Sequence, residues 1–260
     1  MDALLFPLPS FVKVYGPLGV SSLALCGIAG TLAGRLLTGW LHRHAAPPFR
    51  ETLELSLGPL LLGLLLGARA LNQFAVGDLV WYSPFSWLRV TGYSLSFTGG
   101  LVGAVLAVVW FVRRSREGDA LAVLDALAPG AALAVAIGWL GVPVLGRITH
   151  LPWALSPAPG VGIQPVQIYG FLGFGVIAAA LSWQSGRLDY LGQNFVSFVL
   201  LMAAFRFVLG FTEQTPAVAG PWSLTQLADA GTVLAGVGLA AWIRRPARAA
   251  GPPAPEGGAS

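Results

Sequence analysis

The sequence predicts an all-α integral membrane protein, a single bundle of seven transmembrane helices. The chain of 260 residues is 55% hydrophobic and 10% charged, with a mean hydropathy of +0.73. A soluble domain of this size has too little interior to hide that much apolar surface, so bilayer lipid must be the solvent. Seven apolar stretches reach the ~20 residues that a helix needs to cross a bilayer. Two arginines, Arg69 and Arg206, lie inside such stretches.

The seven predicted spans follow one another along the chain without an internal repeat. They cover residues 17–37, 52–72, 94–112, 121–144, 167–183, 192–211 and 224–243. The first lacks a basic leader and an Ala-x-Ala site, so we expect a retained helix and not a cleaved signal peptide. Together the spans form one membrane domain over residues 1–247. The tail, residues 248–260, is rich in Pro, Gly and Ala and is predicted to be disordered.

Helix start and stop signals mark the later spans. Pro143 lacks a backbone donor and is predicted to end the fourth helix, whereas Pro165 fits the first turn of the fifth. Gln167 and Tyr169 then enter the bilayer, where their polar groups need partners. Ser223 is the predicted N-cap of the seventh helix, and a glutamine three residues later would close a capping box with it.

Paired glycines, Gly99 and Gly100, open the third helix, and two interpretations of them remain open. Glycines at a helix start expose backbone N–H groups, which together with the helix dipole can bind an anion. Small residues also let two helices approach closely, and Gly99-xxx-Gly103 fits that spacing.

Basic residues are distributed unevenly among the loops, which predicts the orientation. Those on one side of the membrane are Arg35, Arg43, Arg50, Arg113, Arg114, Arg116, Arg187, Arg244, Arg245 and Arg248. Lys13, Arg89 and Arg147 lie on the other side. The positive-inside rule therefore places the N-terminus outside and the C-terminus in the cytoplasm. The net charge of +4 reflects this topology and an affinity for anionic lipid headgroups, so we expect no nucleic-acid partner.

Two long loops fall on the outward side. Residues 73–93 are rich in aromatic side chains, which favour the membrane interface. Residues 145–166 contain Arg147 and His150. Because functional residues concentrate on loops held by a rigid scaffold, we expect the binding side to face outward.

Arg69 and Arg206 are the leading candidates for a functional site. A guanidinium keeps its proton, and at the centre of a bilayer it costs at least ~2.5–3.5 kcal/mol, so it needs an anion. A lipid phosphate is the most available anion there, and it can accept two parallel hydrogen bonds from arginine. The alternative is a structural pair with a carboxylate or with backbone carbonyls. Asp229, one turn inside the last helix, could pair with either arginine.

Other kinds of site lack the residues they need. The single cysteine, Cys26, excludes an intramolecular disulfide and a cysteine metal site. The three histidines lie in predicted loops, and the sequence has no paired carboxylates at catalytic spacing and no His-Glu-x-x-His motif. We therefore expect neither a metal nor a cofactor.

Taken in order, segments between residues 13 and 245 resemble the bacterial prolipoprotein diacylglyceryl transferases. The main matching segments are Gly67-Ala68-Arg69, Ser96-Phe97-Thr98-Gly99-Gly100-Leu101, Leu124-Asp125-Ala126-Leu127-Ala128-Pro129, Gln164-Pro165-Val166-Gln167-Ile168-Tyr169, Arg206-Phe207-Val208-Leu209-Gly210 and Leu224-Thr225-Gln226. The resemblance implies a multi-pass protein of the bacterial inner membrane. It also implies transfer of the diacylglyceryl group of phosphatidylglycerol to the cysteine thiol of a lipoprotein precursor.

The resemblance further implies a phospholipid cavity between the helices. Its expected lining is Arg69, Thr98, Gly99, Gly100, Gln167, Tyr169, Arg206 and Gln226. Arg69 and Arg206 would hold the phosphate, and Arg206 is the expected catalytic residue.

Several positions depart from the family's motifs. They are Thr98 and Gln164 (histidine in the family), Trp139 and Glu213 (arginine), Val142 (asparagine), and Gly170 and Gly210 (glutamate). Histidine suits general-base catalysis, so proton transfer from the thiol loses its usual acceptor. Arg69 and Arg206 are retained and can stabilise a phosphate leaving group, and Arg147 is a candidate to replace the missing arginine.

Two functions are therefore predicted as alternatives. The first is a lipid-group transferase that acts on a membrane phospholipid and a lipoprotein precursor. The second is a non-catalytic relative that binds lipid or serves as a structural subunit of a membrane protein complex. The retained arginines favour the first function, and the lost histidines and carboxylates favour the second.

Overall fold

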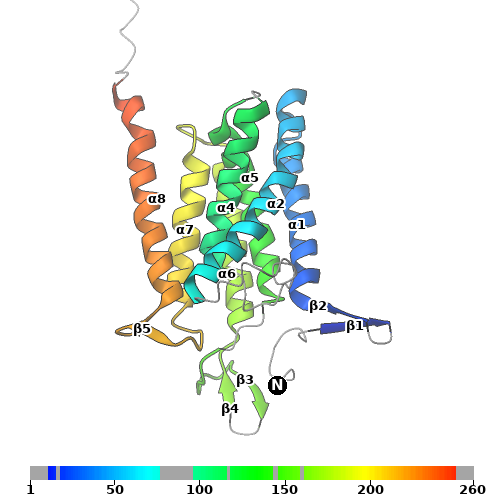
Figure 1. The fold of residues 1–260 in the computed structure, drawn as a ribbon, viewed down its shortest axis with the longest axis vertical. Coiled ribbons are helices and arrows are strands. Elements are labelled where there is room, and N and C mark those ends of the chain that lie inside the picture. Colours follow the sequence, from blue (N-terminus) through cyan, green and yellow to red (C-terminus); the bar gives the residue numbers. More distant parts are fainter. Residues whose placement is uncertain are drawn as a thin grey trace, which may run out of the picture.

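Seven helices and three short β-hairpins make up the described part of the protein (Figure 1). The computed structural model describes residues 11–15, 18–76, 96–115, 118–142, 146–158 and 161–249. The helices are α1 (Ser22–Leu41), α2 (Pro47–Val76), α4 (Phe97–Ser115), α5 (Ala120–Trp139), α6 (Val166–Gln184), α7 (Gln193–Leu209) and α8 (Leu224–Ala249). Most of the aromatic loop 73–93, and the predicted tail from residue 250 onward, lie outside the described residues.

The helical membrane architecture predicted from the sequence is confirmed. Within the described ranges, six helices are long and apolar enough to cross a bilayer. The remaining one, α7, has 17 residues and is shorter than the predicted span 192–211. At 1.5 Å per residue it reaches about 26 Å, the lower limit for a span. The fourth span was predicted to reach residue 144, but α5 ends at Trp139 because tighter turns follow, with Gly141 N–H donating to the Gly138 carbonyl at 3.0 Å.

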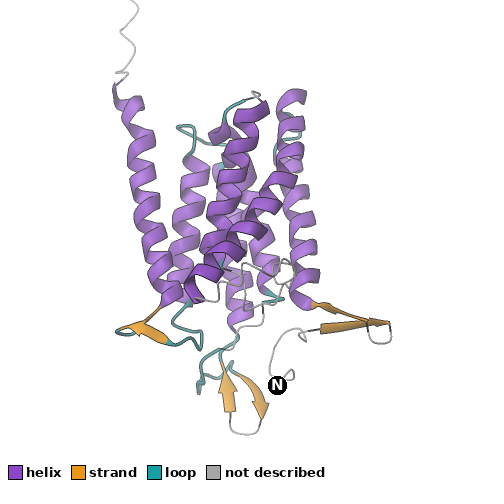
Figure 2. Cartoon of the chain, in the orientation of Figure 1, coloured by secondary structure: helices purple, strands orange, loops and turns teal. Residues whose placement is uncertain are grey.

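Three antiparallel hairpins lie together at one end of the bundle, and the sequence analysis did not predict them (Figure 2). They pair β1 (Phe11–Tyr15) with β2 (Leu18–Ser21), β3 (Leu155–Ala158) with β4 (Val161–Ile163), and β5 (Ala217–Ala219) with β6 (Trp222–Ser223). The first predicted span began at residue 17, but residues 18–21 pair as β2 and the helix starts at Ser22. We call this end of the bundle the hairpin end. We call the opposite end the loop end; it carries loops 42–46, 118–119 and 185–192.

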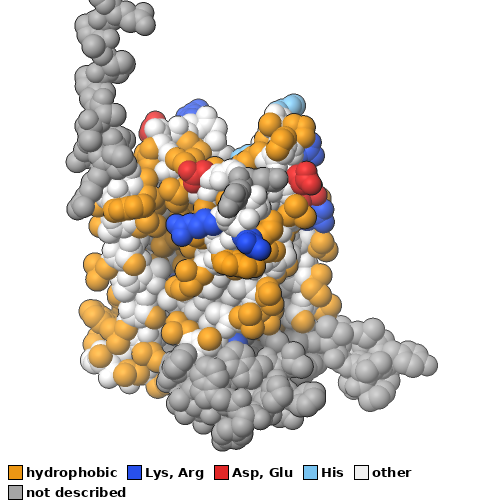
Figure 3. Space-filling model, turned by 45° about the horizontal axis from the view of Figure 1, so that its top comes forward, with side chains coloured by type: hydrophobic (Ala, Val, Ile, Leu, Met, Phe, Trp, Pro, Cys, Tyr) orange, Lys and Arg blue, Asp and Glu red, His pale blue; other side chains and the backbone are white. Residues whose placement is uncertain are grey.

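Helix α5 is the centre of the bundle and packs against α1, α2, α4, α6 and α7. Its residues 123–130 are all buried, so no face of this part of the helix is open to lipid. Small residues allow the close packing, since a Cβ on Gly34 of α1 would meet the backbone of Gly130. Large hydrophobic side chains such as Leu36, Leu234 and Trp242 lie exposed instead on the outer helices, and orange atoms cover the sides of the bundle in Figure 3.

Helices α2 and α4 approach each other through four glycines. A Cβ on Gly63 or Gly67 would collide with backbone atoms of α4, and a Cβ on Gly99 or Gly103 would collide with carbonyl oxygens of α2. Without side chains at these positions the two backbones come into direct contact, as small-xxx-small packing allows.

Candidate functional site

Arg206 lies inside the bundle, towards the hairpin end, where it forms an ion pair with Asp229. Arg206 Nε and Asp229 Oδ1 are 3.3 Å apart, and the two side chains are 13% and 3% exposed. The guanidinium carbon also lies 4.4 Å from the ring centre of Phe97 on α4 and 5.9 Å from that of Trp139 on α5. Of the two pairings that the sequence allowed for Asp229, the structure has the one with Arg206.

The ion pair uses only part of the guanidinium. Among the described residues, the one hydrogen bond to Arg206 is made by Nε, so its two terminal nitrogens keep their donors for another acceptor. Arg206 carries its side chain one helical turn before the end of α7, where the bundle meets the hairpins. A second anion could therefore bind the same guanidinium without breaking the contact to Asp229.

Arg69 lies half-buried on α2, beside Gly67 and Ala68. The first turn of α4 contacts α2 next to Arg69 and also contacts Arg206. Ser96 N–H donates to the Ala68 carbonyl at 2.9 Å, while the neighbouring Phe97 ring covers Arg206. Both arginines thus border one turn of α4.

Two interpretations of Gly99 and Gly100 were open, an anion site and close helix packing. The contacts in the first turn of α4 favour close packing. The amide of Gly99 donates to Ser96 Oγ at 3.2 Å and that of Gly100 to the Ser96 carbonyl at 2.9 Å, so these two N–H groups already have acceptors. Both glycines are buried, and Gly99 lies against Gly67. Thr98, between them and Phe97, is half-buried.

Glu213 is a second acidic residue near the ion pair, and sequence reasoning noted it only as a departure. Its side chain is 7% exposed, and no hydrogen bond to its carboxylate is present among the described residues. Burial raises the pKa of Glu213; the positive charge of Arg206 opposes this rise and the negative charge of Asp229 adds to it. The sequence signal that could have identified it is a lone glutamate seven residues after Arg206 at the end of an apolar run.

Arg147 holds the backbone of Glu213 in place. Its Nε donates to the Glu213 carbonyl at 3.1 Å, and its backbone N–H donates to the Thr212 carbonyl at 2.8 Å. Its own carbonyl accepts from Gln164 N–H at 3.0 Å. Arg147 thus connects the loop after α5 to the turn after α7 and to the start of α6.

The polar residues at the start of α6 have the partners that burial requires. Gln167 is buried, and its Nε2 donates to the Val142 carbonyl at 3.5 Å. The hydroxyl of Tyr169 accepts from Trp153 Nε1 at 2.7 Å. Gln164 differs, because its buried Oε1 has no hydrogen-bond partner among the residues that the structure describes.

The predicted capping box at the start of α8 is present. Ser223 N–H donates to Gln226 Oε1 at 2.9 Å, and Gln226 N–H donates back to Ser223 Oγ at 3.3 Å. Gln226 Nε2 also donates to the Phe207 carbonyl at 3.3 Å. Gln226 therefore joins α7 to α8 close to Arg206, and this role uses both ends of its amide.

Two positions where the resembled family carries glutamate are closed by packing. A Cβ on Gly170 would run into the ring of Trp139, and a Cβ on Gly210 would touch the Gln226 side chain. Trp139 also stacks on Phe174, with ring centres 5.9 Å apart. A tryptophan and a glycine here fill space that a charged pair would need.

Comparisons with known proteins agree with the geometry. A model of the prolipoprotein diacylglyceryl transferase family matches residues 9–242. A phosphatidylglycerol–prolipoprotein diacylglyceryl transferase of Bordetella bronchiseptica is 32% identical over 205 residues, which cover 71% of this chain and 75% of that protein. The Geobacter sulfurreducens protein of the same name is 30% identical over 199 residues (72% and 76%). The Vibrio vulnificus one is 28% identical over 253 residues (91% and 93%). With a match along most of its length, the chain belongs to the prolipoprotein diacylglyceryl transferase family, transferases of lipoprotein biosynthesis in the bacterial inner membrane.

Proposed function

We propose that this chain transfers the diacylglyceryl group of phosphatidylglycerol to the cysteine thiol of a lipoprotein precursor. The observation that carries the proposal is the state of Arg206, a largely buried guanidinium with two terminal nitrogens still able to donate. A lipid phosphate matches that fork of donors, and the contact is strong because both partners are charged. Arg69 would bind the same phosphate from the other side of the first turn of α4.

In this proposal the hairpin end faces outward, and the lipid lies between the helices that surround Arg206. The residues proposed to line its site are Thr98, Gly99 and Gly100 on α4, Gln167 and Tyr169 on α6, and Gln226 on α8. Arg147 acts indirectly, since it fixes the turn that carries Glu213.

The proposed reaction is a substitution at carbon coupled to one proton transfer. The thiol sulfur attacks the phosphate-bearing carbon of the diacylated glycerol, an S–C bond forms, and the C–O bond breaks with its electron pair, which leaves on glycerol phosphate. Arg206 and Arg69 stabilise the charge that develops there. The thiol proton needs an acceptor, and Thr98 cannot serve because its hydroxyl is not basic near neutral pH. Glu213 is the proposed acceptor, since its carboxylate is close enough to Arg206 to feel its charge.

A non-catalytic lipid-binding subunit is the second candidate function. It is favoured by the ion pair that Arg206 already makes with Asp229 and by the packing of Trp139 against Gly170. In that case the protein would bind a phospholipid and leave its bonds intact.

A transfer assay separates the two functions. The purified protein in phosphatidylglycerol nanodiscs is mixed with a lipobox peptide, and mass spectrometry detects a diacylglyceryl adduct on the peptide cysteine. We expect Arg206→Ala to slow transfer by about 10²–10³-fold, the range for loss of one stabilising donor. Glu213→Gln should slow it by about 10²–10⁴-fold, the range for loss of a general base.

Arg35→Ala is the matched control. Arg35 forms an exposed surface pair with Glu54, with side chains 57% and 62% exposed, and such pairs contribute little. Its transfer rate should equal that of the wild type. Wild-type protein that retains phosphatidylglycerol but never modifies the peptide would overturn the transferase and favour the lipid-binding subunit.

A further inference from the structure

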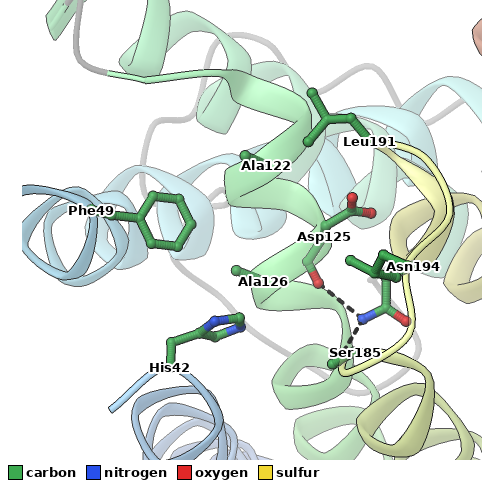
Figure 4. A pocket seen from close by; sticks show the side chains of 9 residues that line it. His42, Phe49, Ala122, Asp125, Ala126, Ser185, Leu191 and Asn194 are labelled. Atoms are coloured by element: carbon green, nitrogen blue, oxygen red, sulfur yellow. Dashed lines mark hydrogen bonds between the residues drawn. The ribbon is translucent and has the colours of Figure 1, made fainter. Parts of the chain in front are cut away.

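A second polar site lies at the loop end of the bundle, far from Arg206 along the helices. It is a cavity of about 180 Å³, formed where α1, α2, α5, α6 and α7 begin or end (Figure 4). Its polar lining comes from His42, Asp125, Ser185 and Asn194, and Phe49 forms an apolar wall. None of these residues takes part in the proposed transfer reaction.

The polar wall of the cavity is held rigidly. Asp125 is buried, and its Oδ2 and Oδ1 accept from the amides of Gly192 at 2.6 Å and Phe195 at 2.7 Å. Asn194 Nδ2 donates to the Asp125 carbonyl at 3.2 Å and to Ser185 Oγ at 2.9 Å. These bonds fix the orientation of the Asn194 amide, because a flipped amide would place its oxygen against the Asp125 carbonyl.

Two buried polar atoms in this lining have no partner among the described residues. Asn194 is 1% exposed, yet its Oδ1 makes no hydrogen bond there, and neither does the buried Nε2 of His42. Burial lowers the pKa of His42, and a hydrogen bond to the Ala126 backbone opposes this fall. Folding therefore favours the neutral imidazole, which donates from one nitrogen and accepts at the other. Among the described residues, the cavity lining has unused acceptors, a carboxylate and an aromatic wall, and contains no lysine or arginine.

Such a lining suits a small cation that donates several hydrogen bonds. A primary ammonium has three N–H donors and is attracted by an aromatic face. Exposed arginines, Arg43 and Arg50, are the chain neighbours of His42 and Phe49 and could hold an anion next to the cavity. The headgroup of phosphatidylethanolamine is such an ammonium, joined to a phosphate by a short linker, and the ends of spanning helices are where lipid headgroups are expected.

We propose that the loop-end cavity binds the ethanolamine headgroup of a phospholipid. The ammonium donates to Asn194 Oδ1 and His42 Nε2, and the phosphate lies on Arg43 and Arg50. This lipid is a bound ligand and not the substrate, so the inference does not depend on the proposed reaction.

A headgroup methylation series tests the proposal. The full-length protein is purified in detergent, exchanged with equal amounts of phosphatidylethanolamine, its monomethyl and dimethyl forms, and phosphatidylcholine, and analysed by native mass spectrometry. Each methyl removes one N–H donor. The monomethyl form keeps two donors for the two acceptors, so its retention should be close to that of phosphatidylethanolamine. Because a hydrogen bond to a charged group changes affinity by about tenfold or more, we expect retention to fall for the dimethyl form and to be at least about 10-fold lower for phosphatidylcholine.

Variants locate the effect. His42→Phe keeps a ring of similar size and removes one of the two acceptors, so it should lower phosphatidylethanolamine retention to the level of the dimethyl form. The control is His150→Phe, at an exposed histidine near the hairpin end, which should leave retention unchanged. Free ethanolamine at the same concentration should not displace the lipid, and displacement would overturn the lipid source. Equal retention of all four lipids, the result expected if only water fills the cavity, would overturn the proposal. Unchanged retention in His42→Phe protein that unfolds at the wild-type temperature would do so too.

Discussion

Asp125 and Asp229 are both buried acids in a membrane bundle, but they are stabilised in opposite ways. Asp125, at the loop end, forms no ion pair with any described residue and accepts two short hydrogen bonds from backbone amides at the start of α7. Asp229, towards the hairpin end, makes one longer contact of 3.3 Å to Arg206. Both oxygens of Asp125 accept hydrogen bonds, whereas the terminal nitrogens of the Arg206 guanidinium donate to no acceptor in the described part of the chain.

The two environments predict different roles. Asp125 is part of the fold, whereas the contact of Asp229 with Arg206 can be replaced by another anion. Backbone amides cannot leave a helix start, so the cap on α7 is a permanent part of the fold. A guanidinium can exchange one anion for another, because carboxylate and phosphate offer it the same pattern of acceptors. In the proposed function, Asp229 would therefore stabilise Arg206 before a lipid binds and would share it with the bound phosphate.

We expect the largest loss of stability when Asp125 is removed. Asp125→Ala leaves two buried amides without acceptors, and each should cost about 1–3 kcal/mol of the free energy of unfolding. The loss should be the same in phosphatidylglycerol and in phosphatidylcholine nanodiscs, as measured by thermal unfolding. Asp119→Ala removes an exposed cap that accepts from Leu121 N–H at 2.8 Å and should cost only about 1 kcal/mol. A smaller loss for Asp125→Ala than for this control would contradict the comparison.

Asp229→Asn should give a loss that depends on the lipid. In phosphatidylcholine the variant leaves a buried guanidinium without its anion, which typically costs about 3–5 kcal/mol. In phosphatidylglycerol an anionic lipid can take the place of the carboxylate, so the loss should largely disappear. Unfolding of the same preparation in the two lipids measures the difference. Equal losses in both would show that Asp229 is structural in the way that Asp125 is.

A substitution in the contact between α2 and α4 should cause an intermediate loss of stability, and this loss should not depend on the charge of the lipid. Gly103→Ala places a methyl group against the Gly63 carbonyl, and we expect a loss of about 1–3 kcal/mol from overpacking. Gly39→Ala is the control, since no atom lies within 4 Å of the added carbon; it should be neutral or stabilising by up to about 1 kcal/mol. Matching unfolding temperatures for the two variants would mean that the helices separate easily here.

The smallest expected effect is the pH dependence from Glu213. Burial raises its pKa in the folded protein above the ordinary value of 4.5, so folding favours the protonated acid. Its contribution to stability should be fully present below about pH 4.5 and lost as the pH rises through the folded pKa. Glu213→Gln should remove that part of the pH profile measured by chemical unfolding. An unchanged profile in the variant would show that Glu213 ionises as freely in the fold as in the unfolded chain.

Local patterns in the sequence predicted the helices and their caps, because the residues that decide these features are close in the chain. The apolar runs gave the order of the seven helices, and Ser223 and Gln226, three residues apart, gave the capping box. The hairpins were missed because each is only a few residues per strand in a segment rich in Pro and Gly, with no long alternating pattern.

The site could be predicted only in part, because its partners come from distant parts of the chain. The cost of burying Arg206 predicted an anion, but which arginine Asp229 would reach depends on how α7 packs on α8. Asp125 was known only as part of a motif. Its role as a cap joins it to Gly192 and Phe195, 67 and 70 residues away, and no local rule for capping extends that far.

The packing of Trp139 against Gly170 has an evolutionary consequence. An arginine alone at position 139 would introduce a buried cation with no carboxylate at position 170, and a glutamate alone at position 170 would collide with the indole ring. Either single substitution is therefore expected to destabilise the fold. The effect of a change at one position depends on the residue at the other, so the two positions are expected to be epistatic.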